Sequence, residues 1–137
     1  MESGDAFPQR DEIALYVERA HQALRAAEHN LEDGFYATTV NRAYYAVFYA
    51  ANALLATLGL ARNKHSGVIA AFRQYFIKPE IIESEYSNIY GRTMENRHTA
   101  DYELGVLMDP QVAGDDLRDA RCFVERIERH LREEGWL

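Results

Sequence analysis

Apolar side chains recur at steps of three and four along most of the chain, which is the spacing of one face of an α-helix. The first series predicts a helix over 10–33, and Gly34 suits its end because glycine adopts the left-handed cap conformation at little cost. A wider series predicts a second helix over 36–58, closed by Gly59. The apolar positions of the two series are Ile13, Val17, Ala20, Leu24, Ala27 and Leu31, then Val40, Tyr44, Val47, Phe48, Ala51, Leu54, Leu55 and Leu58.

Three more helices are expected after this hairpin, over 66–78, 80–107 and 110–134. Ser66 is the expected N-cap of the third helix. Pro79 should end that helix and suits the first turn of the fourth. The pair at 109–110, Asp-Pro, breaks the chain before the fifth helix.

Short connections between these helices predict an all-α fold, an antiparallel up-and-down bundle of four to five helices. Residues 1–9, which include Pro8, are expected to form a flexible lead-in to a single domain over 10–137. A length of 137 residues and a hydrophobic fraction of 47% suit one domain with a genuine core.

The net charge and the cysteine count limit the binding partners and the cellular compartment that the protein can have. With 22 acidic and 15 basic residues, the net charge of −7 is opposite in sign to that of proteins that coat DNA or anionic membranes. One cysteine, Cys122, excludes an internal disulfide and fits a reducing compartment. The acidic N-terminus lacks a signal core, and no apolar run approaches the ~20 residues that span a bilayer. We expect a cytoplasmic protein that contacts no membrane.

The second helix carries Arg42, Tyr45 and Tyr49 within two turns. An arginine three residues before a tyrosine can stack on it, and the pair could bind a phosphate or a base. Alternatively, the tyrosines fill the bundle with their hydroxyls at its rim. Lys64 and His65 precede the third helix, where free amides could hold an anion. They are equally consistent with an ordinary cap in a solvated loop.

The fourth helix carries Arg92 and a denser polar cluster, Arg97, His98, Asp101 and Tyr102. At ~100° per residue, Asp101 shares a face with Arg97 and also with His98, so it could orient either side chain. Arginine grips phosphate through its planar fork, and histidine moves protons near neutral pH. The alternative interpretation is a run of helix-stabilising salt bridges with Tyr102 packed inward.

No metal or cofactor is expected. The five histidines are scattered without metal-ligand spacing, and one cysteine is too few for a zinc centre. No phosphate-binding loop, dinucleotide fingerprint or nucleophile elbow is present.

Four segments resemble, in order and spacing, the small stand-alone prokaryotic branch of the HEPN family, named for higher eukaryotes and prokaryotes and for nucleotide binding. The similarity covers about residues 10–134. The segments are Arg-Ala-Tyr-Tyr-Ala-Val-Phe-Tyr-Ala at 42–50, Lys-His-Ser-Gly-Val-Ile at 64–69, Phe-Ile-Lys at 76–78 and Arg-His-Thr-Ala-Asp-Tyr at 97–102.

The resemblance implies a helical bundle that forms homodimers and cleaves RNA without a metal, commonly as a toxin paired with a nucleotidyltransferase antitoxin. The family motif is an arginine, four to six residues, then a histidine. Two such motifs meet across the dimer. By this analogy Arg97, His98, Asp101 and Tyr102 are the candidate catalytic residues. The candidate residues for binding RNA or a nucleotide are Arg92, Arg42, Tyr45, Lys64 and His65.

The chain departs from that motif at one position. If the motif begins at Arg97, Tyr102 occupies the place of the histidine. If it begins at Arg92, five residues separate that arginine from His98, and the spacing fits the motif. Tyrosine, with a pKa near 10, is a poor base at neutral pH. Two functions therefore stay open. One is RNA cleavage by transesterification at the 2′-hydroxyl, and the other is a non-catalytic module that binds a nucleotide or a nucleotidyltransferase.

Overall fold

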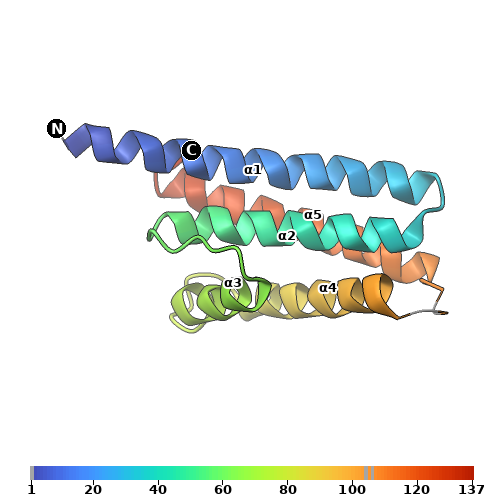
Figure 1. Cartoon of the computed structure of the whole chain (residues 1–137). Helices are drawn as coiled ribbons and strands as arrows, with labels where there is room; N and C mark the ends of the chain where they lie inside the picture. The colour runs from blue at the N-terminus through green and yellow to red at the C-terminus, as the bar shows by residue number, and fades with distance from the viewer. Residues whose placement is uncertain (1, 104, 106) are drawn as a thin grey trace.

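The computed structural model describes residues 2–103, 105 and 107–137, and this part of the chain forms an up-and-down bundle of α-helices (Figure 1). The all-α fold predicted from the sequence is confirmed. Its elements are α1 (Glu2–Glu32), α2 (Tyr36–Ala56), α3 (His65–Phe72), the π-helical turn η1 (Arg73–Ile77), α4 (Ser84–Tyr102) and α5 (Pro110–Glu133).

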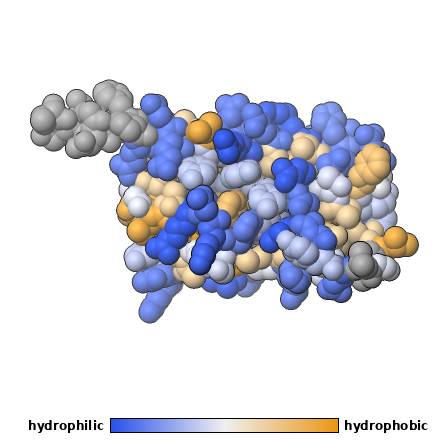
Figure 2. Space-filling model, viewed as in Figure 1, coloured by the Kyte–Doolittle hydropathy of each residue, from blue (hydrophilic) through white to orange (hydrophobic). Residues whose placement is uncertain are grey.

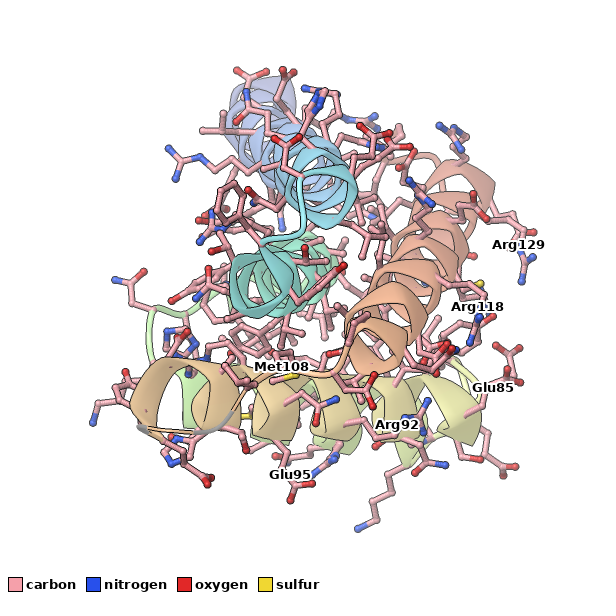
Figure 3. The ribbon with its side chains drawn as sticks, turned by 90° about the vertical axis from the view of Figure 1, so that its right-hand side faces the viewer. Glu85, Arg92, Glu95, Met108, Arg118 and Arg129 are labelled. Atoms are coloured by element: carbon pink, nitrogen blue, oxygen red, sulfur yellow. The ribbon has the colours of Figure 1, made fainter. Side chains whose placement is uncertain are left out.

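Helix α2 lies at the centre of the bundle and packs against α1, α3, α4 and α5. Seen end-on, it is surrounded by its neighbours, with α4 and α5 meeting on one side (Figure 3). Small side chains such as Ala43, Ala46 and Ala50 are fully or almost fully buried along it, which lets the other helices approach closely. The core is completed by aromatic rings from three other elements, Phe72, Tyr90 and Phe123.

The predicted first residues of the first and third helices are wrong. Helix α1 begins at Glu2 rather than near residue 10. Helix α3 begins at His65, so Ser66 is not its N-cap. Lys64 takes that position in an extended conformation, without a side-chain capping bond.

The fourth helix also differs, because α4 begins at Ser84 and ends at Tyr102 instead of spanning 80–107. Glu80 has φ of 63°, in the left-handed region, and cannot continue a helix. The amides of Ile81 and Ile82 both donate to the Phe76 carbonyl, at 3.0 and 2.9 Å. This turn buries Ile82 completely. Burial of an isoleucine therefore outweighs the helix propensity of the segment.

A pair of glycine substitutions should change stability in opposite directions. Gly34 has φ of +82°, so alanine there should destabilise the fold by about 1 kcal/mol although nothing obstructs its methyl group. Gly114 lies within α5 with equally open space, so alanine there should stabilise the fold by about 0.5 kcal/mol. Urea unfolding of both variants measures this. Equal shifts would contradict a backbone origin of the difference.

The face seen in Figure 2 is mostly hydrophilic, and its orange apolar residues form small groups, several of them toward the two ends of the bundle. Exposed large apolar residues include Phe35 and Leu107, of which Leu107 is 94% exposed. Within the described residues, no helix combines the length and apolarity needed to cross a membrane.

Candidate functional site

Arg97 of α4 is the centre of the predicted polar cluster. Its Nη1 lies 3.4 Å from Oδ2 of Asp101, one turn further along the same helix. Helix geometry brings such a pair onto one face. The Arg97 side chain is only 12% exposed, against 27% for Asp101. Asp101 thus orients Arg97, the first of the two partners that the sequence left open.

Aromatic rings surround the guanidinium of Arg97. Its Cζ atom lies 4.9 Å from the ring centre of Tyr44 and 6.0 Å from that of Tyr45, both on α2. The ring centre of Tyr102 lies 5.9 Å away. Cation–π attraction is strongest where water is excluded. The arginine is therefore held in one orientation on an aromatic bed in which the Tyr44 ring is fully buried.

Asn41 joins this arrangement from α2. Its side-chain amide donates to both carboxylate oxygens of Asp101, at 3.0 and 3.3 Å. Its carbonyl oxygen accepts from Nε and Nη2 of Arg42, at 2.9 and 2.8 Å. The Arg42 guanidinium also stacks on Tyr45, with 4.8 Å between Cζ and the ring centre. The chain Arg42–Asn41–Asp101–Arg97 fixes two arginines relative to each other.

His65, at the first position of α3, completes the cluster. Its Nδ1 and the Tyr44 hydroxyl share a hydrogen bond of 2.6 Å, and its ring stacks on Phe48 at 4.6 Å between centres. Burial lowers the pKa of His65, and the charge of Arg97 lowers it further. Burial raises the pKa of the Tyr44 hydroxyl, which the charge of Arg97 partly opposes. At neutral pH the pair is therefore a neutral imidazole and a protonated phenol.

The remaining predicted residues lie at different distances from this cluster. His98 is exposed and contacts Tyr102, with 5.0 Å between ring centres. Lys64 is exposed beside His65, at the cap of α3. Arg92 lies apart, because its Nη2 binds Asp119 of α5 at 3.2 Å, and Figure 3 shows it on the side of α4 that faces α5.

Sequence reasoning assigned no role in the site to Asn41 or Tyr44. Tyr44 was placed in the apolar stripe of its helix, and it is indeed fully buried. A tyrosine within such a stripe carries a hydroxyl that needs a partner, and this was the available signal. Asn41 directly precedes Arg42, but its contact with Asp101, 60 residues away, depends on how α2 and α4 pack.

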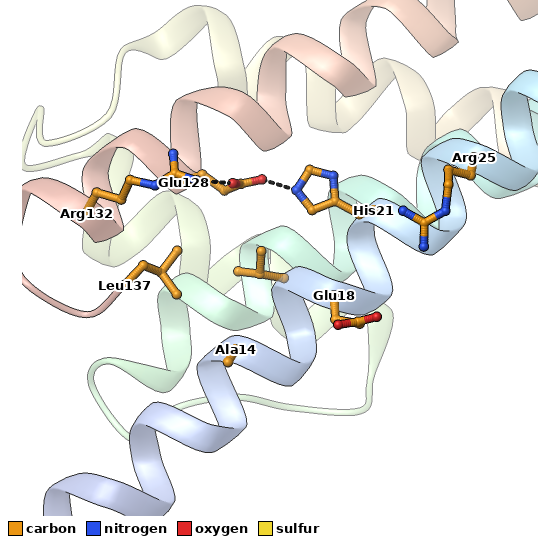
Figure 4. Close-up of a pocket in the computed structure, with 8 residues that line it drawn as sticks. Ala14, Glu18, His21, Arg25, Glu128, Arg132 and Leu137 are labelled. Atoms are coloured by element: carbon orange, nitrogen blue, oxygen red, sulfur yellow. Dashed lines mark hydrogen bonds and ion pairs between the residues drawn. The ribbon is translucent and has the colours of Figure 1, made fainter.

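A separate open cleft of about 410 Å³ lies between α1 and α5 (Figure 4). His21 of α1 binds Glu128 of α5, and Glu128 also binds Arg132 at 2.9 Å. Arg25 lines the α1 side of the cleft. None of the candidate site residues lies here, and the contact between His21 and Glu128 ties the first helix to the last.

The described residues contain no group of three or more histidine, cysteine, aspartate or glutamate side chains that could hold a metal ion. The candidate site thus consists of two arginines, a carboxylate, an amide, a histidine and tyrosines. This set can bind a phosphate and move a proton.

Comparison with known proteins agrees with the earlier resemblance. The family model for the HEPN domain matches residues 13–130. A protein of Thermotoga maritima named "UPF0332 protein" is 36% identical over 121 residues, covering 88% of this chain and 92% of that one. A protein of Methanocaldococcus jannaschii named "Putative toxin MJ0605" is 38% identical over 124 residues, covering 90% and 92%.

Proposed function

Because the chain belongs to the HEPN family, we propose that it is a metal-independent endoribonuclease of a toxin–antitoxin type system. The observation that carries the proposal is the largely buried guanidinium of Arg97, held by Asp101 over the Tyr44 ring. A preoriented guanidinium stabilises charge that builds on a phosphate without reorganising during the reaction. The toxin name of the archaeal relative supports the same class of function.

The reaction is transesterification within the RNA. The 2′-oxygen attacks the adjacent phosphorus, the bond to the 5′-oxygen breaks, and a cyclic phosphate and a 5′-hydroxyl result. One proton leaves the 2′-hydroxyl and one reaches the departing oxygen. Arg97 offsets the charge on the phosphate, and His98 accepts the proton from the 2′-hydroxyl. Asp101 and Tyr102 orient these two side chains. Positive potential comes from Arg42 and Lys64, while Tyr45 and His65 contact the nucleotide. Arg92, expected from the sequence to add to it, lies apart and pairs with Asp119.

The geometry adds His65 as a second candidate for the proton transfer. Burial and the charge of Arg97 lower its pKa, which favours the neutral imidazole, the form that accepts a proton. The charge of Arg97 lowers the pKa of His65, whereas the ring of His98 contacts Tyr102. The two histidines can be separated by mutation.

A homodimer is part of the proposal, with α4 as the contact element. Tyr102 at the end of α4 is 63% exposed and Leu107 beyond it is 94% exposed. Burying these side chains between two copies would remove apolar surface from water and bring the two Arg97 sites together.

The test is cleavage of a mixed RNA substrate in EDTA by the wild type and by Arg97→Ala, His98→Ala and His65→Gln. The wild type should cut and Arg97→Ala should not. The histidine variant that loses activity identifies the proton carrier. All variants should first be shown to be folded and to have the wild-type sedimentation coefficient. Intact RNA at high wild-type concentration would overturn the nuclease proposal.

The alternative is a non-catalytic module that holds a nucleotide or a nucleotidyltransferase antitoxin. Tyr102 at the position of the family's histidine and the net charge of −7 favour it. Under this alternative the wild type leaves RNA intact, whereas a nucleotide or the partner protein still binds at the Arg97 site.

A further inference from the structure

A second groove runs between α1 and α2, and we call it the α1–α2 groove. Its volume is about 260 Å³. Its lining residues are Arg19, Gln22, Ala23 and Ala26 of α1 with Arg42 and Tyr49 of α2. None of these six residues is acidic, although acidic residues outnumber basic ones by 22 to 15 in the chain. The groove is therefore locally positive on an acidic protein.

The α1–α2 groove adjoins the candidate site through shared side chains. Arg42 lines the groove and also binds Asn41, which holds Asp101. The ring centres of Tyr45 and Tyr49 lie 5.9 Å apart, so Tyr49 continues the aromatic bed away from Arg97. An extended ligand could pass from one to the other without leaving arginine and tyrosine side chains.

The groove lies on an open side of the helical hairpin. Helix α5 packs behind α1 and α2 in the view of Figure 1, and the six residues that line the groove all belong to α1 and α2. Ala23 is 4% exposed and forms part of the floor, so a flat ring could approach the backbone closely. Arg19 is exposed, and its charge is available to a ligand.

We propose that the α1–α2 groove binds the single-stranded RNA that flanks the cleaved bond. Arg42 and Arg19 each neutralise a phosphate, and an unpaired base stacks on Tyr49 with the Gln22 amide at its edge. Stacking on tyrosine requires a base that is free of a duplex, which selects single strands. This assignment rests on the proposed function, since it names how the substrate of that site is held.

The test uses a fluorescent single-stranded RNA whose 2′-hydroxyls are all methylated, because this oligonucleotide can bind but cannot undergo the reaction. Anisotropy titrations should show that Arg19→Ala weakens binding by about fivefold and lowers the salt-dependence slope by about 0.7, the value for one phosphate on a single strand. Tyr49→Leu should weaken binding by about tenfold through lost stacking. A duplex of the same sequence should bind more weakly than the single strand.

Arg25→Ala is the matched control. It removes the same charge from the same helix, but Arg25 lines the cleft between α1 and α5. It should leave the affinity for the single strand unchanged, and thermal melting should show that all variants are folded. Equal losses for Arg19→Ala and Arg25→Ala would overturn the proposal, because only net charge would then matter.

Three other results would also overturn it: no loss in Arg19→Ala, no binding by the wild type, or equal binding of the duplex. Binding and cleavage are measured on different substrates, so the two proposals can fail separately. If the methylated strand binds through Arg19 but unmodified RNA stays intact, the groove stands and the nuclease proposal falls. The reverse pattern removes the groove alone.

Discussion

Replacing Arg97 with lysine should lower the rate of RNA cleavage by about 10²–10³-fold, nearly as far as replacement with alanine. The positive charge is kept, but lysine has a compact, strongly hydrated ammonium in place of a planar fork. It cannot stack on Tyr44 while it binds both Asp101 and a phosphate. The loss should lie mainly in kcat, because the guanidinium acts on charge that develops in the transition state.

Single-turnover cleavage rates measure this effect, with Arg118→Lys as the control. Arg118 is exposed on α5 and pairs with Asp115 at 3.0 Å, so its replacement should leave the rate unchanged. A lysine variant that retained most of the activity would show that charge alone suffices. The aromatic bed would then have no catalytic purpose.

Replacing Phe123 with alanine should destabilise the fold by about 3–5 kcal/mol. Phe123 is fully buried on α5. Its ring centre lies 5.4 Å from that of Phe72, 5.8 Å from Tyr90 and 6.2 Å from Tyr86. Three elements lose their common contact when this ring is removed, and a rigid bundle cannot close the resulting cavity.

Urea unfolding measures the loss, and the neighbouring residue supplies the control. Cys122 is exposed, so Cys122→Ser should change stability by no more than about 0.5 kcal/mol. Phe123→Leu should fall between the two, since it refills part of the space. A loss below about 1 kcal/mol in Phe123→Ala would mean that the core repacks around this position.

The helices that follow local rules could be predicted from the sequence. Asp109 accepts a hydrogen bond from the Gln111 amide at 2.7 Å, and Pro110 begins α5 at the expected residue. The start of α4 could not, because tertiary contacts decide it. Glu80 takes a left-handed conformation so that Ile82 can be buried. The spacing of apolar residues along the sequence does not indicate that the helix is interrupted here.

The same distinction applies to the site. The pair of Arg97 and Asp101 follows from a spacing of four residues along one helix. The contact between Tyr44 and His65 joins two elements across 21 residues and depends on where α3 rests on α2. The role of each residue in RNA cleavage stays a prediction until the substitutions are made.

Asn52 of α2 fixes the position of the loop that leads to α3. It is 1% exposed within α2, and its side chain forms two hydrogen bonds with the backbone of Arg62, at 2.9 and 3.0 Å. The loop that delivers His65 is thus fastened to the helix that carries Tyr44. Residues inserted between 57 and 59, where Leu58 and Gly59 are exposed, would bulge into solvent and leave the histidine in place. Residues inserted between Arg62 and His65 would displace it, so relatives should tolerate length variation on only one side of Arg62.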